Sequence, residues 1–368
     1  MKLSLHGRTG AIALTGVLAL SLAACGSDDP TGSGNAAAPS QSTLTGELNG
    51  AGATSQEKAM DAWRAGFQNA NPDVTVNYDP VGSGGGRTQF LDGSVEFAGS
   101  DSALTAEELE SATSTCTTEA VDLPVYISPI AVVFNLDGLT ELNLSAATLA
   151  GIFSNTITTW DAPEIAAENP GVTLPATAIT PVHRSDESGT TKNFTDYLAK
   201  ASGGAWAYEA DGNWPVEGGE SAQGTSGVIQ TVQGGEGTIA YADNSAVGTL
   251  GVASIKVGDD WVAPSEEGAA AAVDASPRDE ERSEHDIVIE IDRQTTAPGA
   301  YPLILISYGL VCLQYDTAEK ADLVKGFFSY VVSEEGQSAA EEAAGSAPLS
   351  DALRSDVQAA IDAIAAPA

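Results

Sequence analysis

The chain has 368 residues, with 51 acidic residues against 15 lysines and arginines, and its formal net charge is −36. This charge argues against binding to nucleic acid and against docking on an anionic membrane surface through charge. The apolar share of 42% is normal for a folded protein, and the length allows one large core or two lobes. Such an acidic protein binds an anion only through local dipoles and hydrogen bonds, because its long-range field opposes the ligand.

The first residues have the features of a targeting segment. A short basic start is followed by an apolar run from Ala11 to Leu22, which is too short to span a bilayer comfortably. The run closes on Leu22-Ala23-Ala24-Cys25-Gly26, which resembles a bacterial lipoprotein lipobox. The resemblance implies a signal peptide over residues 1–24 and a lipid on Cys25. An ordinary secretory signal with an incidental cysteine is the alternative.

The segment after the lipobox and the cysteine count fit an exported chain. Residues 25–43 are rich in Gly, Ser, Ala and Pro, which predicts a flexible tether. With Cys25 lipidated, Cys116 and Cys312 remain as an even pair in an oxidising compartment. That pair favours a disulfide, and two buried free thiols are the alternative.

Two strand-to-helix turns follow in chain order. A strand over 44–48 runs into a glycine-rich turn that ends on Thr54 and Ser55, before apolar residues at helical spacing. A second strand over 74–78 precedes the glycine-rich stretch at Ser83, which opens another helix. The first amides of a helix lack intrahelical partners and attract anions. Neither turn has the spacing of a nucleotide or dinucleotide loop, and ordinary strand-to-helix loops are the alternative.

A third predicted strand, over 95–101, ends in a carboxylate. Asp101 in its ionised form only accepts hydrogen bonds, so it repels an anion unless the ligand carries a proton. A role in a loop or a helix cap is the alternative for this residue. Thr105 then matches a capping box and predicts the start of a helix.

The richest stretch is His183–Thr191, between a predicted strand and a predicted helix. Arg184 supplies a fixed, forked cation, while Ser188, Gly189 and Thr190 supply hydroxyls and a tight turn at a helix start. These features predict an anion site. A capped helix beside a surface ion pair is the alternative.

The rest of the chain predicts mainly scaffold. The apolar stretch 121–134 is strand-like but interrupted by two prolines, and residues 225–232 and 238–241 predict a helix and a strand. Residues 265–286 predict an acidic surface insertion without chemistry. Residues 301–313 predict an apolar strand pair, and two amphipathic helices close the chain. Alternating strands and helices predict an α/β fold with mainly parallel sheets and ligand turns at strand ends.

Taken in order, four motifs resemble the phosphate-binding lipoproteins of bacterial phosphate ABC importers. They are the stretches 50–54, 82–86, 95–101 and 184–191. The resemblance implies a two-lobed, type II periplasmic-binding-protein-like fold with a central ligand cleft and two crossover strands. It divides the chain into lobe 1, residues 44–125 plus 300–368, and lobe 2, residues 126–299.

The resemblance also implies a site and a role. Phosphate-contacting groups fall on Thr54, Ser55, Ser83, Asp101, Arg184, Ser188, Gly189 and Thr190. Asp186 would hold Arg184 in place. The implied role is binding of inorganic phosphate, without cofactor or metal, by a monomer anchored at the outer face of the cytoplasmic membrane and serving ABC permease subunits. One departure is Ser55-Gln56-Glu57, where the family commonly has an aromatic residue and a proline.

Two other functions fit parts of the pattern. A secreted phosphohydrolase would need a base for Ser188, and His183 is poorly placed for it because the serine-elbow spacing is absent. The three histidines show no spacing typical of metal ligands. A receptor for sulfate, molybdate or another oxyanion is the third reading, and Asp101 argues against it because those anions carry no proton.

Overall fold

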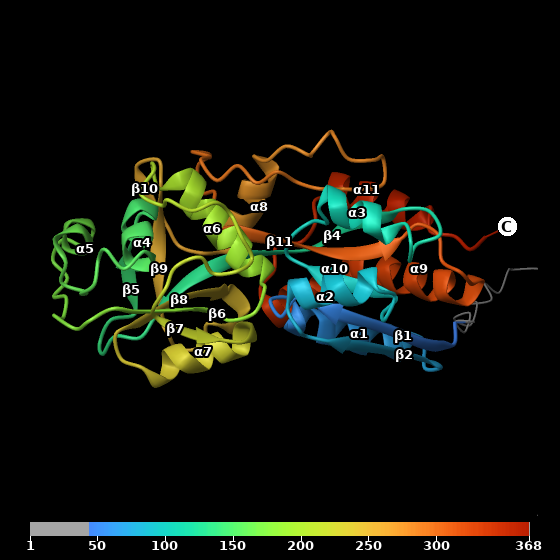
Figure 1. The fold of residues 1–368 in the computed structure, drawn as a ribbon, viewed down its shortest axis with the longest axis horizontal. Helices are drawn as coiled ribbons and strands as arrows, with labels where there is room; N and C mark the ends of the chain where they lie inside the picture. The colour runs from blue at the N-terminus through green and yellow to red at the C-terminus, as the bar shows by residue number, and fades with distance from the viewer. Residues whose placement is uncertain (1–43, 368) are drawn as a thin grey trace, which may run out of the picture. The chain divides into compact units, whose positions relative to one another are not determined.

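The computed structural model describes residues 44–367 (Figure 1). The predictions for the signal peptide, the lipid on Cys25 and the tether at residues 25–43 lie outside this part. Among the described residues, no helix has both the length and the apolar character needed to cross a membrane.

The first elements alternate strand and helix, as the pattern predicted. They are β1 (Gly46–Gly52), α1 (Glu57–Ala70), β2 (Val74–Asp79), α2 (Ser83–Leu91) and β3 (Phe97–Ser100). Strand β1 pairs in parallel with both β2 and β3. All three strands therefore end at one edge of the sheet, where α1 and α2 begin.

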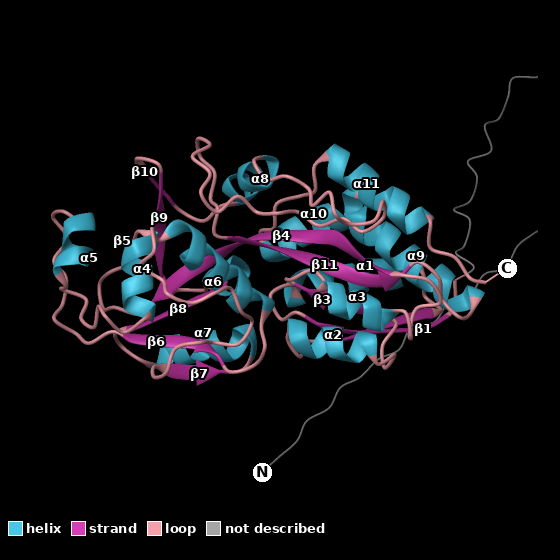
Figure 2. Cartoon of the chain, turned by 45° about the horizontal axis from the view of Figure 1, so that its top comes forward, coloured by secondary structure: helices cyan, strands magenta, loops and turns pink. Residues whose placement is uncertain are grey.

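A second parallel group repeats this arrangement. It comprises β6 (Thr180–Arg184), α6 (Gly189–Ala201), β7 (Glu220–Ala222), α7 (Gly224–Gly234) and β8 (Thr238–Asp243). Strand β6 pairs in parallel with β7 and β8, and α7 packs on β6 and β8 (Figure 2). The strand ends again share one edge, and α6 and α7 begin there.

Two long strands connect these groups. The buried strand β4 (Ala120–Phe134) pairs antiparallel with β11 (Ile304–Cys312) and with β8, and β11 pairs antiparallel with β3. The α/β class is confirmed, with mixed sheets because these long strands run against their neighbours. Strand β4 continues through both prolines, and its register with β11 shifts beside Pro124, which has no amide hydrogen to donate. The predicted strand pair at 301–313 was wrong, since β11 is one strand.

The remaining elements cover the sheets. Thr105 caps α3 with the predicted capping box, and Ser145 caps α4. Helix α10 was not predicted because it is alanine-rich with few large apolar residues, and it packs on α1. The elements not yet given are α3 (Ala106–Ala112), β5 (Glu141–Asn143), α4 (Ala146–Phe153), α5 (Pro163–Glu168), η1 (Asn244–Ala246), β9 (Gly251–Val257), β10 (Asp260–Val262), α8 (Glu266–Asp274), α9 (Ala318–Val332), α10 (Glu334–Ala344) and α11 (Asp351–Asp362).

The acidic segment 265–286 is not the solvated insertion that the sequence predicted. Helix α8 buries Gly268, Ala269 and Ala272, and Asp286 is only 2% exposed. The Asp286 carboxylate accepts a hydrogen bond from the Asp122 amide at 2.9 Å and pairs with Arg282 at 3.0 Å. Small residues and one compensating arginine thus let part of an acidic segment enter the interior.

The predicted pairing of Cys116 with Cys312 is confirmed as a disulfide. It joins the loop after α3 to the end of β11, across a sequence separation of 196 residues. Closing so long a loop restricts the unfolded chain strongly.

Replacing both cysteines, Cys116→Ser with Cys312→Ser, is expected to lower the free energy of unfolding by about 3–5 kcal/mol, because the unfolded chain regains its loop entropy. Urea unfolding of the two ligand-free proteins, followed by circular dichroism, measures this difference. An unchanged unfolding midpoint would contradict the stabilising role of the disulfide.

Candidate anion-binding site

The residues predicted to contact an anion all lie where the two sets of strand ends meet. Each is less than a tenth exposed: Thr54, Ser55, Ser83, Asp101, Arg184, Ser188, Gly189 and Thr190. They come from the turns or first residues at the starts of α1, α2 and α6, from the residue after β3 and, for Arg184, from the end of β6. Four stretches that are far apart in sequence therefore form one buried polar cluster.

Asp101 is the centre of this cluster. Its carboxylate accepts hydrogen bonds from the Ser55 hydroxyl at 2.6 Å and from the Thr190 hydroxyl at 2.9 Å. Its backbone amide donates to the Ser83 Oγ atom at 3.2 Å, and its carbonyl oxygen accepts from the Asn193 amide at 2.7 Å. One residue thus connects the beginnings of three helices.

Gly189 allows α6 to approach Asp101 closely. A Cβ atom at this position would lie 2.6 Å from both the Asp101 Cβ and the Ser83 Oγ. Contacts that short do not occur in real structures, so neighbouring groups would have to move. The glycine lets the first amides of α6, which lack intrahelical partners, reach the cluster.

Arg184 is held by Asp186, as predicted. The Arg184 Nε donates to Asp186 Oδ1 at 2.8 Å, and its Nη2 contacts Asp186 Oδ2. The Gly224 amide donates to the same carboxylate at 3.1 Å. Burial opposes ionisation of Asp186, but these bonds outweigh it and lower its pKa. In this two-pronged contact, the Nε and Nη2 atoms of Arg184 face Asp186, so Nη1 remains as a donor for a ligand.

The structure adds Thr225 to the cluster. Its Oγ1 lies 2.9 Å from the Thr54 Oγ1, and its amide donates to the same oxygen at 3.1 Å. Sequence reasoning assigned residues 225–232 only to a helix. The available signal was Gly224-Thr225 at a helix start, which repeats the pattern of Gly189-Thr190.

A second buried carboxylate lies close enough to Asp101 for the two charges to interact. Asp243 at the end of β8 is fully buried and accepts hydrogen bonds from the Tyr126 hydroxyl at 3.1 and 3.2 Å. Burial raises the pKa of Asp243 to about 6, and the charge of Asp101 contributes in the same direction. Nothing in the sequence indicated this residue, because its position near Asp101 depends on the pairing of β8 with β4.

The cluster suits a protonated oxyanion. Helix amides, hydroxyls and one arginine nitrogen can donate, whereas Asp101 can only accept while it is ionised. Burial raises the pKa of Asp101, and hydrogen bonds from Ser55 and Thr190 oppose this rise. Within residues 44–367, no group of three or more His, Cys, Asp or Glu side chains could hold a metal ion.

Gly189→Ala is expected to destabilise the folded protein by about 2–4 kcal/mol, because its methyl group overlaps Asp101 and Ser83. Gly234→Ala is the matched control, since a Cβ there meets no described atom within 4 Å. Thermal unfolding of both variants measures the difference, and equal melting temperatures would contradict the close approach of α6.

Asp243→Asn is expected to change how stability depends on pH. The folded pKa of about 6 lies above the ordinary value of 3.8, so the wild-type carboxyl favours folding most below pH 4 and loses this contribution as pH rises through 6. The variant should therefore gain stability relative to wild type between pH 4 and 7, by at most about 3 kcal/mol. Urea unfolding across this range measures it, and a pH-independent difference would contradict the raised pKa.

Comparisons with known proteins agree with this geometry. Residues 37–335 match the family model described as PBP superfamily domain. The phosphate-binding protein PstS2 of Mycobacterium bovis BCG is 35% identical over 99% of this chain and 100% of its own length. PstS 3 of Mycobacterium leprae is 34% identical over the same shares.

A solved structure is also similar. It is a high affinity periplasmic phosphate-binding protein, PfluDING, bound with phosphate, with 26% identity and a TM-score of 0.72. The match covers 85% of this chain and 93% of that one. This chain therefore belongs to the PstS family of phosphate-binding proteins, within the PBP superfamily.

Proposed function

We propose that this protein binds inorganic phosphate outside the cytoplasm and delivers it to the permease of an ABC importer. The observation that carries the proposal is Asp101, a buried carboxylate that accepts hydrogen bonds from Ser55 before α1 and from Thr190 in α6. Its backbone amide donates to Ser83 at the start of α2. Monohydrogen and dihydrogen phosphate have oxygens to accept hydrogen bonds from the nearby hydroxyls and helix amides, and a P–OH to donate one to Asp101. The phosphate-binding relatives support the same ligand.

The predicted residues divide into donors to the anion and groups that hold them, with Ser55 and Thr190 donating to Asp101. Hydroxyls of Thr54, Ser83 and Ser188 and the free amides of α6 replace the water shell of the anion. The Ser188 Oγ already accepts from the Thr191 amide, so its hydrogen is available to the ligand. Arg184 adds Nη1, while Asp186 fixes its orientation and offsets its charge.

Asp101 provides the discrimination between oxyanions. Sulfate has no proton near neutral pH, so it would face a buried, ionised carboxylate with an oxygen lone pair. Leaving such a charge unpaired costs about 2–5 kcal/mol. Since burial raises the Asp101 pKa, acid converts this acceptor into a donor, and discrimination against sulfate should weaken as pH falls.

Phosphate capture also involves closure of the two predicted lobes, residues 44–125 plus 300–368 and residues 126–299. Strands β4 and β11 would serve as the crossovers. Contacts between Thr54 and Thr225, and between Asp101 and Thr190, join the two sets of residues and support a closed arrangement of the proposed lobes.

Binding fits the site better than hydrolysis. The His183 ring stacks on Trp214 with centroids 5.1 Å apart, and its Nδ1 lies 3.0 Å from the Arg184 carbonyl oxygen. This ring is therefore oriented by other partners and does not serve Ser188 as a base. We infer a receptor without catalytic activity, anchored through Cys25 at the outer face of the cytoplasmic membrane.

Isothermal calorimetry on the detergent-solubilised, ligand-stripped chain tests the proposal. Phosphate should give saturable one-to-one heat at neutral pH, and sulfate should give none. Asp101→Asn should weaken phosphate binding by about 30-fold and allow sulfate to bind, because the amide can donate. The exposed Asp137→Asn is the matched control.

Two results would overturn the proposal in different ways. Equal binding of phosphate and sulfate by the wild type would indicate a general oxyanion receptor and remove the role of Asp101. Failure to bind either anion would exclude phosphate capture.

A further inference from the structure

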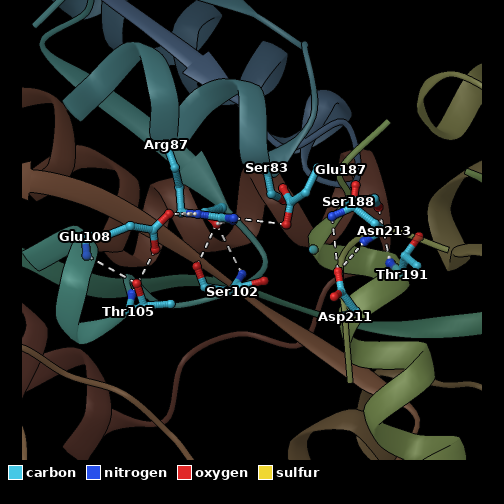
Figure 3. A network of polar contacts seen from close by, with 12 residues as sticks. Ser83, Arg87, Ser102, Thr105, Glu108, Glu187, Ser188, Thr191, Asp211 and Asn213 are labelled. Carbon is cyan, nitrogen blue, oxygen red and sulfur yellow. Dashed lines mark hydrogen bonds and ion pairs between the residues drawn. The ribbon is translucent and has the colours of Figure 1, made fainter. Parts of the chain in front are cut away.

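We propose that Arg87 and Glu187 form a latch that holds the site closed and sets how long phosphate stays bound. Arg87 lies on α2, and Glu187 lies in the loop between β6 and α6 (Figure 3). The Arg87 Nη2 donates to Glu187 Oε1 at 3.0 Å. This inference rests on the proposed function, and neither residue belongs to the predicted phosphate contacts.

Two residues of the same predicted lobe, Glu108 and Ser100, orient the Arg87 side chain independently of Glu187. Its Nε donates to Glu108 Oε1 at 2.9 Å, and its Nη1 donates to the Ser100 Oγ at 3.2 Å. Glu108 is itself fixed, because its Oε2 accepts from the Thr105 amide in the capping box. The Arg87 side chain is only 11% exposed, so it loses little further side-chain entropy when Nη2 meets Glu187.

Glu187 is confined on the other side. A Cβ at Gly84 or at Gly212 would collide with its carboxylate, so two glycines provide the space that it occupies. Its Oε2 is buried and has no hydrogen-bond partner among the described residues. A confined carboxylate with an unsatisfied oxygen depends on the charge of Arg87, because an unpaired charge there is costly.

The latch spans the same helix starts that would hold the anion. Glu187 directly precedes Ser188, and its backbone oxygen lies 3.4 Å from the Gly84 amide, one residue after Ser83. Closing the ion pair therefore brings Ser83 and Ser188 toward one another. It also neutralises a carboxylate that would otherwise repel the ligand.

The main effect of breaking this pair should fall on release. Truncating one partner of a hydrogen-bonded charge pair inside an interface changes dissociation more than association, and this pair is largely enclosed, with side chains 11% and 29% exposed. Glu187→Gln keeps the size of the side chain and removes its charge. Arg87→Gln leaves the Glu187 carboxylate unpaired and should have the larger effect.

Stopped-flow kinetics on ligand-stripped full-length chain with inorganic phosphate tests the latch. We expect Glu187→Gln to speed release by about tenfold while the association rate changes less than twofold. The double variant with Arg87→Gln should release no faster than Arg87→Gln alone, because the two residues act as one pair. Arg354→Gln, which breaks ion pairs with Glu334 and Asp351, is the charge-matched control.

Hydrogen exchange of the ligand-free protein gives a readout that needs no phosphate. The Gly84 amide should exchange several-fold faster in Glu187→Gln than in wild type, while amides in α9 stay unchanged. If the wild type binds phosphate and the variants release it at the same rate, the latch is overturned and the proposed function stays intact. If the wild type binds no phosphate, the exchange rate of the Gly84 amide in Glu187→Gln decides. An unchanged rate overturns the latch. A faster rate supports only the contact between Arg87 and Glu187, without a role in phosphate release.

Discussion

The buried Asp101 carboxylate is the constraint on which the rest of the site depends. It accepts hydroxyl hydrogen bonds from Ser55 and Thr190, which come from segments 135 residues apart by their numbers in the sequence. A buried carboxylate is tolerated only with such partners. The hydrogen bonds that stabilise the buried carboxylate also hold the starts of α1 and α6 together. These bonds therefore help to form the site that we propose for phosphate.

In this strongly acidic protein, the cations near the anion site are paired with carboxylates, so the site carries little net positive charge. Arg184 is paired with Asp186, and Arg87 is paired with Glu108 and Glu187, so the cations near the cluster are already matched by carboxylates. Attraction for an anion then comes from helix amides and hydroxyls, whose dipoles act over short distances. In the function that we propose, selectivity follows from geometry and from Asp101 as acceptor, and it does not need a positive field.

The paired strands β4 and β8 place two more buried polar groups in contact with each other. Asp243 and Tyr126 are buried there, and burial keeps the pKa of both groups raised. Asp122 and Asp286 form a similar buried pair with Arg282, where segment 265–286 meets β4. Acidic residues are thus used inside the protein as well as on its surface, each one held by a named donor.

The sequence by itself determined the local elements and most of the site. Hydrophobic periodicity, the glycine turns and the capping box at Thr105 are local signals, so most strands and helices could be predicted. The candidate site residues came from the resemblance of four motifs to a known family. Only the tertiary structure decided what depends on pairing between distant segments. Thr225, Asp243 and the Arg87–Glu187 pair acquire their roles from neighbours that β4, β8 and α6 bring close, and the burial of Asp286 depends on the distant Asp122 amide. Long-range pairing leaves no periodic pattern in a single chain.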